Sequence, residues 1–452
     1  MKKTIIMVLI AAAIGAYLYF YEIKGGEERQ KEKEASEKLI HFEMDSIQTI
    51  TIHSPQGKFV IEKDGENWQI KEPVGTLGDK SNITSLINNL KNAKKDRTFI
   101  IKKDELDKFG LSGRRAVLVE LKASDGHTLA VKFGDDTNIG SNAYVTLNDS
   151  LVATIPAYIK NSAKHDLFYW RDKKVVHFEK QKIKEFTLHN PFGKYVFKKE
   201  GADWVLTYPL KTKAEQTKVN AILNKFDYQN VKSVVADNPR GLGKYGLNNP
   251  YYKLELLSGE EKAKIDVVFS KPKDGTVYGK ASGRNYVFTL DTLAISPMNK
   301  KLYDYRDKKI LEYDDSHIDR VNLLYNDGLN KLYKDTTNTW YGNDNKRVKG
   351  DKVGKILAAL KNLKVAEFVE EKAVYFRQYG LLNPRGKIEI YSGDKKLAEL
   401  DVGIKSGDKV FVRNPLNKKV VKINESDIAK LFPASSELYD KKEEKKEEKT
   451  DK

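Results

Sequence analysis

Histidine is the residue type here with the clearest capacity to hold a metal ion, because its imidazole nitrogen is a common zinc ligand. The sequence has seven histidines and no cysteine. Four of them form two pairs at matching places in a repeated pattern described below: His41 with His177, and His53 with His189. The third copy has Glu312 and Tyr325 at those places. Because one copy lacks both histidines, we interpret them as structural strand residues and predict no metal site.

A second candidate for metal chemistry is the run Asp136-Thr-Asn138-Ile-Gly140, which resembles the start of a calcium-binding loop. Such a loop needs a glutamate at its twelfth position to bind Ca²⁺ through both carboxylate oxygens, and none is present there. The matching stretches 273–275 and 406–408 do not keep the pattern. We therefore interpret the run as a polar hairpin turn.

The motifs of several common catalytic sites are missing from the sequence. It contains no Gly-x-Ser-x-Gly, His-Glu-x-x-His or phosphate-binding Gly-Lys-Ser/Thr run. The lack of cysteine excludes a thiol nucleophile, thiolate metal sites and disulfides. An acidic pair assembled from distant strands stays open. We predict that the protein is not an enzyme and assign no catalytic residue, cofactor or metal.

The formal net charge is +17, and the stalk and tail defined below carry almost balanced charges, so the excess lies in the folded part. A basic surface indicates anionic neighbours such as lipid headgroups, acidic glycans or nucleic acid. The membrane anchor predicted below argues against nucleic acid. A charge that serves only solubility is the equally weighted alternative.

The N-terminal residues predict a membrane anchor. Lys2 and Lys3 precede an apolar run from Thr4 to Tyr21, which as a helix would span roughly 27 Å, close to the hydrocarbon thickness of a bilayer. The run ends in aromatic residues typical of a membrane interface, whereas a cleaved signal peptide, the alternative, would end in small residues. The flanking charges predict a cytoplasmic N-terminus and export of the rest.

Three of the four tryptophans, Trp68, Trp204 and Trp340, are separated by the same 136 residues. An amphipathic helix pattern, apolar at i, i+3, i+4 and i+7, follows each of them: Ile83/Leu86/Ile87/Leu90, Val219/Ile222/Leu223/Phe226 and Val353/Ile356/Leu357/Leu360. An aromatic-Gly-Leu run comes next in each copy, at 109–111, 245–247 and 379–381. A run containing Asp-Lys-Lys closes each copy, at 169–174, 305–309 and 438–442. A period of this length is that of a whole domain, so we predict a triplicated module.

Within a module, the sequence predicts a strand at 47–53, a tight turn at 54–57, a strand at 58–62 and then the tryptophan strand. The helix follows, and a second group of strands begins at 116–121. The fold class is therefore α+β: a transmembrane helix, then three modules of antiparallel sheet with one or two packed helices each. We interpret the tryptophans as core residues, with ligand stacking as the alternative, and the aromatic-Gly-Leu run as a turn.

The predicted boundaries follow from these landmarks. They are an anchor over 1–21, a charged, helix-prone stalk over 22–38, module 1 over 39–174, module 2 over 175–309, module 3 over 310–440 and a charged disordered tail over 441–452.

The layout resembles a bacterial family known as domain of unknown function 4340. The resemblance rests on the anchor, the strands ending at Trp68 and Trp204, the helix after each and the run from Tyr245 to Pro250. Members of this family combine an N-terminal anchor with β-rich modules, and they are often encoded beside ABC-type exporter permeases and components likened to gliding-motility machinery. The resemblance implies an accessory role outside the cytoplasm and supplies no catalytic residues.

Together these observations predict a non-enzymatic accessory or scaffold subunit of an ABC-type transport or envelope-assembly complex. Its expected location is the bacterial inner membrane, crossed once, with most of the chain periplasmic or otherwise extracytoplasmic. The expected partners are permease or envelope proteins and no nucleic acid. The alternatives are a protein that binds anionic envelope polymer or lipid through basic module faces and, more remotely, a periplasmic hydrolase. Module 3 has drifted furthest from the shared motifs and is where we expect a specialised surface.

Overall fold

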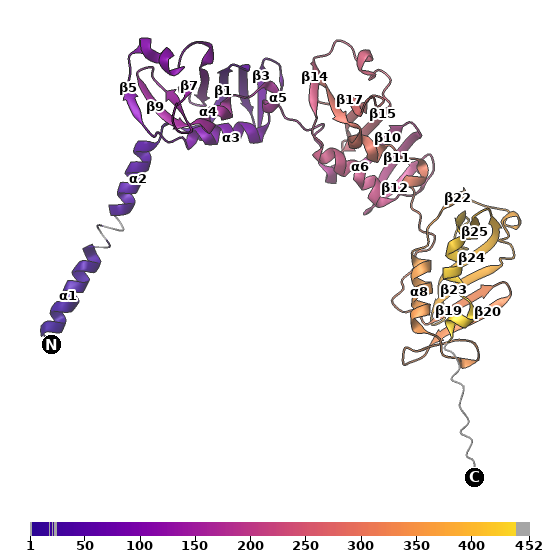
Figure 1. Ribbon diagram of the computed structural model, residues 1–452. Coiled ribbons are helices and arrows are strands. Elements are labelled where there is room, and N and C mark those ends of the chain that lie inside the picture. Colours follow the sequence, from indigo (N-terminus) through magenta and orange to yellow (C-terminus); the bar gives the residue numbers. More distant parts are fainter. Residues whose placement is uncertain (1, 18, 20, 22–24, 440–452) are drawn as a thin grey trace. The chain divides into compact units, whose positions relative to one another are not determined.

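The computed structural model of the protein describes residues 2–17, 19, 21 and 25–439 and contains three antiparallel sheets with packed helices (Figure 1). Each sheet lies within the range of one predicted module. Grouped by contacts, the chain forms two compact units: Met1–Lys180, Lys225–Lys253 and Lys264–Ile295 in one, and Gln181–Asn224, Leu254–Ala263 and Ser296–Lys452 in the other. The contacts described below between modules 1 and 2 lie inside the first unit, and those between modules 2 and 3 lie inside the second.

The sheet of module 1 has nine strands in the spatial order β4-β3-β2-β1-β6-β7-β8-β9-β5. Two meanders, β1 to β4 and β6 to β9, meet where β1 pairs with β6. In chain order the strands are β1 (Ile47–Ser54), β2 (Gly57–Asp64), β3 (Asn67–Glu72), β4 (Thr76–Leu77), β5 (Thr98–Ile100), β6 (Val117–Ala123), β7 (Thr128–Asp136), β8 (Asn142–Thr146) and β9 (Leu151–Pro156).

Module 2 repeats this order as β13-β12-β11-β10-β15-β16-β17-β18-β14. Its strands are β10 (Ile183–Asn190), β11 (Gly193–Glu200), β12 (Asp203–Tyr208), β13 (Thr212–Lys213), β14 (Ser233–Asp237), β15 (Tyr252–Ser258), β16 (Ala263–Phe269), β17 (Thr276–Ala281) and β18 (Tyr286–Asp291).

Module 3 has the order β21-β20-β19-β23-β24-β25-β26-β22. The short strand corresponding to β4 is reduced there to a bridge between Tyr341 and Arg347. The strands are β19 (Arg320–Tyr325), β20 (Gly328–Lys334), β21 (Trp340–Tyr341), β22 (Glu367–Glu370), β23 (Gly386–Ser392), β24 (Lys395–Ser406), β25 (Lys409–Arg413) and β26 (Val420–Asn424).

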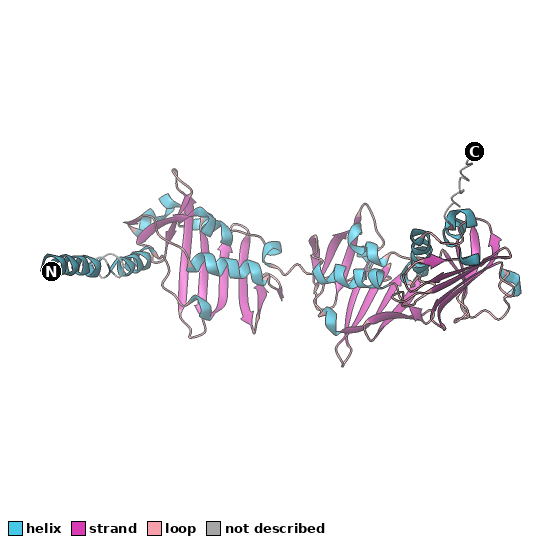
Figure 2. Ribbon diagram, turned by 90° about the horizontal axis from the view of Figure 1, so that it is seen from below, coloured by secondary structure: helices cyan, strands magenta, loops and turns pink. Residues whose placement is uncertain are grey.

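One amphipathic helix per module packs on the sheet, as predicted (Figure 2). These are α3 (Lys80–Lys91), α6 (Gln216–Tyr228) and α8 (Gly350–Lys361). Asp79 begins α3 by accepting a hydrogen bond from the backbone N–H of Asn82. The predicted apolar positions lie in the core or at its margin, with Ile87 and Leu357 only partly buried. The shorter helices are α4 (Ala157–Ala163), α5 (Leu167–Trp170), α7 (Leu302–Tyr305), α9 (Glu425–Leu431) and α10 (Ser435–Leu438).

The three repeated tryptophans are core residues, which confirms that interpretation. Their exposed fractions are 6% for Trp68, 3% for Trp204 and 8% for Trp340. The fourth, Trp170, is completely buried at the end of module 1.

The predicted turns are also present. The first hairpin of each module has a two-residue turn, and in module 3 both turn residues, Asn326 and Asp327, have positive φ as a type I′ turn requires. The aromatic-Gly-Leu runs are short 3₁₀ turns, each ended by a glycine in the left-handed conformation: Gly110, Gly246 and Gly380.

The predicted transmembrane helix over 1–21 is wrong. The helix α1 covers Lys2–Tyr17, 16 residues, and two of these are the lysines at its start. Its length of roughly 24 Å is less than a bilayer core requires. Among the described residues, no helix is both long enough and apolar enough to span a membrane. The apolar run predicted a membrane span that the described helix is too short to provide.

Two predicted segments flank the modules, the stalk before module 1 and the tail after module 3. Helix α2 (Gly25–Glu37) covers most of the predicted stalk. The predicted disordered tail over 441–452 lies outside the described residues.

Candidate functional site: the junctions between modules

Of the four histidines interpreted as strand residues, His53 and His189 lie on strands, whereas His41 and His177 lie outside the strands. His53 on β1 and His189 on β10 each face a glutamate on the neighbouring strand, Glu120 and Glu255, with Nε2–Oε2 distances of 3.8 and 3.5 Å. Within the described part of the chain, no group of three or more His, Asp or Glu side chains is placed to hold a metal ion.

The run that resembles a calcium loop joins β7 to β8, so it is a hairpin connection as predicted. Asp136 pairs with the ammonium of Lys160 at 2.5 Å, and Lys160 is buried with a further hydrogen bond to the carbonyl of Gly134. A lysine ammonium therefore holds the carboxylate that would have opened a calcium site.

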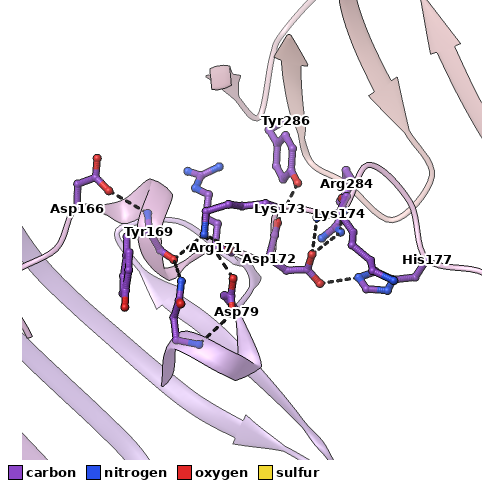
Figure 3. A network of polar contacts seen from close by, with 11 residues as sticks. Asp79, Asp166, Tyr169, Arg171, Asp172, Lys173, Lys174, His177, Arg284 and Tyr286 are labelled. Carbon is purple, nitrogen blue, oxygen red and sulfur yellow. Dashed lines mark hydrogen bonds and ion pairs between the residues drawn. The ribbon is translucent and has the colours of Figure 1, made fainter. Parts of the chain in front are cut away.

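A polar cluster containing residues from modules 1 and 2 lies at the junction between them, which begins with α5. Asp166 caps α5 by accepting from the N–H of Tyr169, and the helix ends in the buried Trp170 (Figure 3). The backbone then joins the edge of the first sheet, because the N–H of Asp79 donates to the carbonyl of Trp170 and the N–H of Asp172 donates to that of Leu77.

The next residue of the chain already bonds to module 2. The N–H of Val231 donates to the carbonyl of Lys173 at 2.7 Å, and the N–H of Val175 donates to that of Gln229 at 2.9 Å. The junction is thus held to both modules by backbone hydrogen bonds, unlike a flexible linker.

Arg171 is the central side chain of this junction. Only 3% of it is exposed, and its two terminal nitrogens donate to the two carboxylate oxygens of Asp237 at 2.7 and 2.6 Å. Asp237 ends β14 in module 2, and the ring of Tyr286 lies 5.5 Å from the guanidinium carbon. A fork-to-carboxylate pair is both strong and directional, so it specifies how Arg171 sits at this contact.

Asp172 organises the other half of the network (Figure 3). It pairs with His177 at 2.5 Å and with the buried Arg284 at 3.2 Å, while Arg284 also donates to the carbonyl of Lys174. Burial alone would raise the pKa of Asp172. The hydrogen bond from His177 and the charge of Arg284 outweigh it, so the pKa lies below its ordinary value of 3.8.

Lys173 completes the cluster from the side of module 1. Its ammonium donates to the carbonyls of Tyr169 and Arg171 and lies 3.4 Å from the carboxylate of Asp79. One lysine therefore satisfies backbone oxygens at the end of α5 and contacts the residue that caps α3.

The junction between modules 2 and 3 repeats the arrangement. Arg306, 5% exposed, pairs with Glu371 just after β22 and lies over the ring of Phe368 at 3.3 Å. Lys308 takes the place of Lys173 and donates to the carbonyls of Asp304 and Arg306. Burial lowers the pKa of Arg306 and the charge of Glu371 opposes that change, but an arginine stays charged at neutral pH.

The end of module 3 has the same backbone bridge as the two junctions, but a tyrosine stands in place of the arginine. Tyr439 pairs with Val348 as Arg171 pairs with Gly78, and its hydroxyl donates to Asn330 of the same module. An arginine–carboxylate pair therefore occurs at the two internal junctions and is missing from this terminal position of the described chain.

The family comparison matches the repeat. The profile of the family described as "Domain of unknown function (DUF4340)" matches residues 68–235, 204–352 and 340–449. These matches cover more than half of the sequence. The chain belongs to this family. Each match starts at one of the repeated tryptophans, and the first two run across the Arg171 and Arg306 junctions of this DUF4340 protein. No curated protein matches the sequence.

The sequence predicts one side of each junction only. The runs at 169–174 and 305–309 repeat and mark the arginine side, whereas no repeated motif marks Asp237 and Glu371. Both lie on or next to an edge strand with a β-bulge, and the extra residue shifts them out of register with module 1. Their signal is a carboxylate 11 residues after the last apolar position of the helix pattern, which is Phe226 in module 2 and Leu360 in module 3.

Replacing Arg171 with glutamine should loosen the first junction. The carboxylate of Asp237 is 35% exposed, so the loss is smaller than for a fully buried pair, about 1.5–3 kcal/mol. Cleavage after Lys173 and Lys174 by a lysine-specific protease should then be about tenfold faster or more. The matched control is Lys355→Gln, which removes an exposed pair with Asp351 and should leave junction cleavage unchanged. Equal cleavage of all three proteins would contradict the role given to Arg171.

The contribution of Asp172 should depend on pH. Because its folded-state pKa is lowered, its stabilisation is complete above the ordinary value of 3.8 and is lost as the pH falls through the lowered value. Hydrogen exchange of the junction peptide, corrected for the intrinsic pH dependence, should be faster in Asp172→Asn than in the wild type at pH 5–7. The difference should shrink below about pH 4. A difference that persists unchanged at pH 2.5 would refute this assignment.

Proposed function

We propose that this DUF4340 protein is a non-enzymatic scaffold, an accessory subunit that presents three related modules to a larger assembly. The observation that supports the proposal is the pair of matching junctions, each built around a nearly buried arginine that binds a carboxylate of the next module.

The free-energy cost of burying an arginine at each junction favours a protein that uses several modules together to recognise a partner. Burying a guanidinium costs free energy that its pairing repays only partly, so such a pair contributes more to specificity than to stability. A chain that needed only to link three independent domains would need no more than a polar linker. Two ordered junctions are consistent with a partner that contacts more than one module at once.

The assembly we propose is the one that the family resemblance implies, an ABC-type transport or envelope-assembly complex outside the cytoplasm. The partner would be a permease or another envelope protein. The location remains a prediction, and it no longer rests on a membrane-spanning helix.

The test compares the partners that are recovered with the wild-type protein and with a variant whose junctions are loosened. Tagged full-length protein would be crosslinked in its native cells, purified and quantified by mass spectrometry, as wild type, as Arg171→Gln/Arg306→Gln and as the control Lys355→Gln. We expect a common set of partners with the wild type and the control, and a loss of about tenfold with the double variant. Recovery of no enriched protein, or equal recovery by all three, would contradict the scaffold.

A second candidate function, binding of an anionic polymer or lipid surface, is favoured by one feature of module 3. A cavity of about 490 Å³ beside the end of α8 is bordered by Lys364, Lys409 and Lys430, with Asp427 as its single carboxylate. Asp427 pairs with Lys430 and the exposed Asp408 pairs with Lys409, so Lys364 would supply most of the attraction.

This alternative predicts salt-sensitive binding. Phosphatidylglycerol vesicles should bind the full chain at low ionic strength, and the affinity should fall roughly tenfold between 50 and 300 mM salt. Lys364→Gln/Lys409→Gln should weaken binding about as much, whereas Lys355→Gln on the outer face of α8 should not. Binding that ignores both salt and the lysines would remove this candidate.

A further inference from the structure

The three modules end their sheets in equivalent edge strands, β5, β14 and β22, each paired with the last long strand of its module. In modules 2 and 3 a β-bulge interrupts this pairing, at Val234/Ala236 and at Phe368/Glu370. In module 1 the register from Thr98 to Ile100 is unbroken. Bulges and charges are two ways in which proteins keep edge strands from pairing with other chains.

The backbone bonds establish which residues correspond. The strand is entered by the same hydrogen bond in each module, from Asp96 to Thr154, from Lys232 to Thr289 and from Ala366 to Lys422. If the strands are aligned from this hydrogen bond and the extra bulge residue is left out, Asp237 of module 2 and Glu371 of module 3 correspond to Ile100 of module 1. The cross-strand neighbour of Asp237 is Tyr286, and that of Ile100 is Leu151.

In modules 2 and 3 this position holds the carboxylate that binds the junction arginine. In module 1 it holds Ile100, whose cross-strand neighbour is Leu151. No module precedes module 1 in the described chain to supply an arginine. Ile100 is 84% exposed and Leu151 is 41% exposed. The strand has lost both the bulge and the carboxylate that its two equivalents keep.

The backbone of β5 is oriented for pairing on its outer side. The N–H of Thr154 donates to the carbonyl of Arg97, and the N–H of Ile101 donates to that of Ser150. Within β5, the residue that bonds to β9 is therefore Phe99, which lies midway between Arg97 and Ile101. Bonding alternates along an antiparallel pair, so Thr98 and Ile100 direct their N–H and C=O groups away from the sheet. Phe99 packs inward against Phe109 at 5.3 Å between ring centroids.

We propose that β5 is a dimerisation edge, at which two copies of this chain pair antiparallel about a two-fold axis at Phe99. Thr98 of each copy then lies opposite Ile100 of the other, with Leu151 beside it, and about four backbone hydrogen bonds form. The same register places Asp96 opposite Lys102 of the second copy, an attractive pair at each end.

A second copy fits this edge better than a head-to-tail neighbour does. A head-to-tail contact would use the residue at the place of Arg171 in the last module, which is Tyr439. That ring packs on the core of its own module and its hydroxyl binds Asn330 there. The edge at β5 instead offers a second copy outward backbone groups and the exposed side chains of Ile100 and Leu151. In the same register Asp96 attracts Lys102, which offsets the repulsion between Lys95 and Lys103. This inference goes beyond the proposed function and does not depend on it.

The absence of cysteine allows a register-specific test. Full-length Thr98→Cys and Ile100→Cys variants would be oxidised separately and as a mixture. Only the mixture places two cysteines directly opposite each other, so its disulfide-linked dimer should exceed that of either variant alone by at least about fivefold. Equal yields in all samples would show association through another surface, such as the apolar helix α1, and no dimer in the mixture would show that the edge does not pair. Either result would overturn the proposal.

A second variant tests the energetics without cysteine. Sedimentation equilibrium of full-length protein should give a dimer for the wild type. The dimer should be at least about tenfold weaker in Ile100→Asp, because the carboxylate would be desolvated between Thr98 of the other copy and Leu151. Leu416→Asp, at an equally exposed leucine (82%) in module 3, is the control and should leave the dimer unchanged. Circular dichroism checks that each variant is folded. A wild-type protein that stays monomeric up to about 100 μM, or equal weakening by both variants, would also overturn the proposal.

Discussion

The burial of an arginine guanidinium at each internal junction is the constraint on which the organisation of this chain depends. A guanidinium cannot lose its charge at neutral pH, so a buried one requires a carboxylate and several further acceptors nearby. Arg171 and Arg306 each obtain that carboxylate from the next module. The lysine two residues later satisfies the carbonyls that the chain exposes as it leaves one sheet, and the neighbouring backbone joins the helix end of the following module.

Within a module, the packing is apolar and local in origin. A helix with apolar residues on one face covers a sheet formed by two meanders, and the repeated tryptophan lies in the core between them. Side chains such as Leu86, Ile222 and Ile356 are almost fully buried, which contributes a few kcal/mol each by area. Polar chemistry is concentrated at the module boundaries, where side chains from two modules must be matched.

The ends of the repeat are specialised in ways that its internal junctions are not. The last junction position is Tyr439, which packs into its own module, and the first receiving position is Ile100, which lies exposed. Repeat proteins commonly alter their terminal repeats because those have a neighbour on one side only. Here the first edge strand also lacks the bulge of its two equivalents, so the alteration leaves a strand able to pair.

The features that could be predicted from the amino-acid sequence are those that depend on neighbours close along the chain. The repeat, the helix faces, the hairpin turns at Ser54 and Asn326, the 3₁₀ turns ended by glycine and the core position of the tryptophans all follow from local periodicity and from residues with special backbone preferences. The prediction was wrong at the N-terminus, where the apolar run indicated a membrane span that the described helix α1 is too short to make. Only the tertiary structure decided that β1 pairs with β6, that Arg171 meets a carboxylate 66 positions away and that Ile100 occupies the place of Asp237. The physical reason is that strand pairing and side-chain contacts are set by the folded sheet, and a single bulged residue shifts the register without leaving a recognisable local pattern.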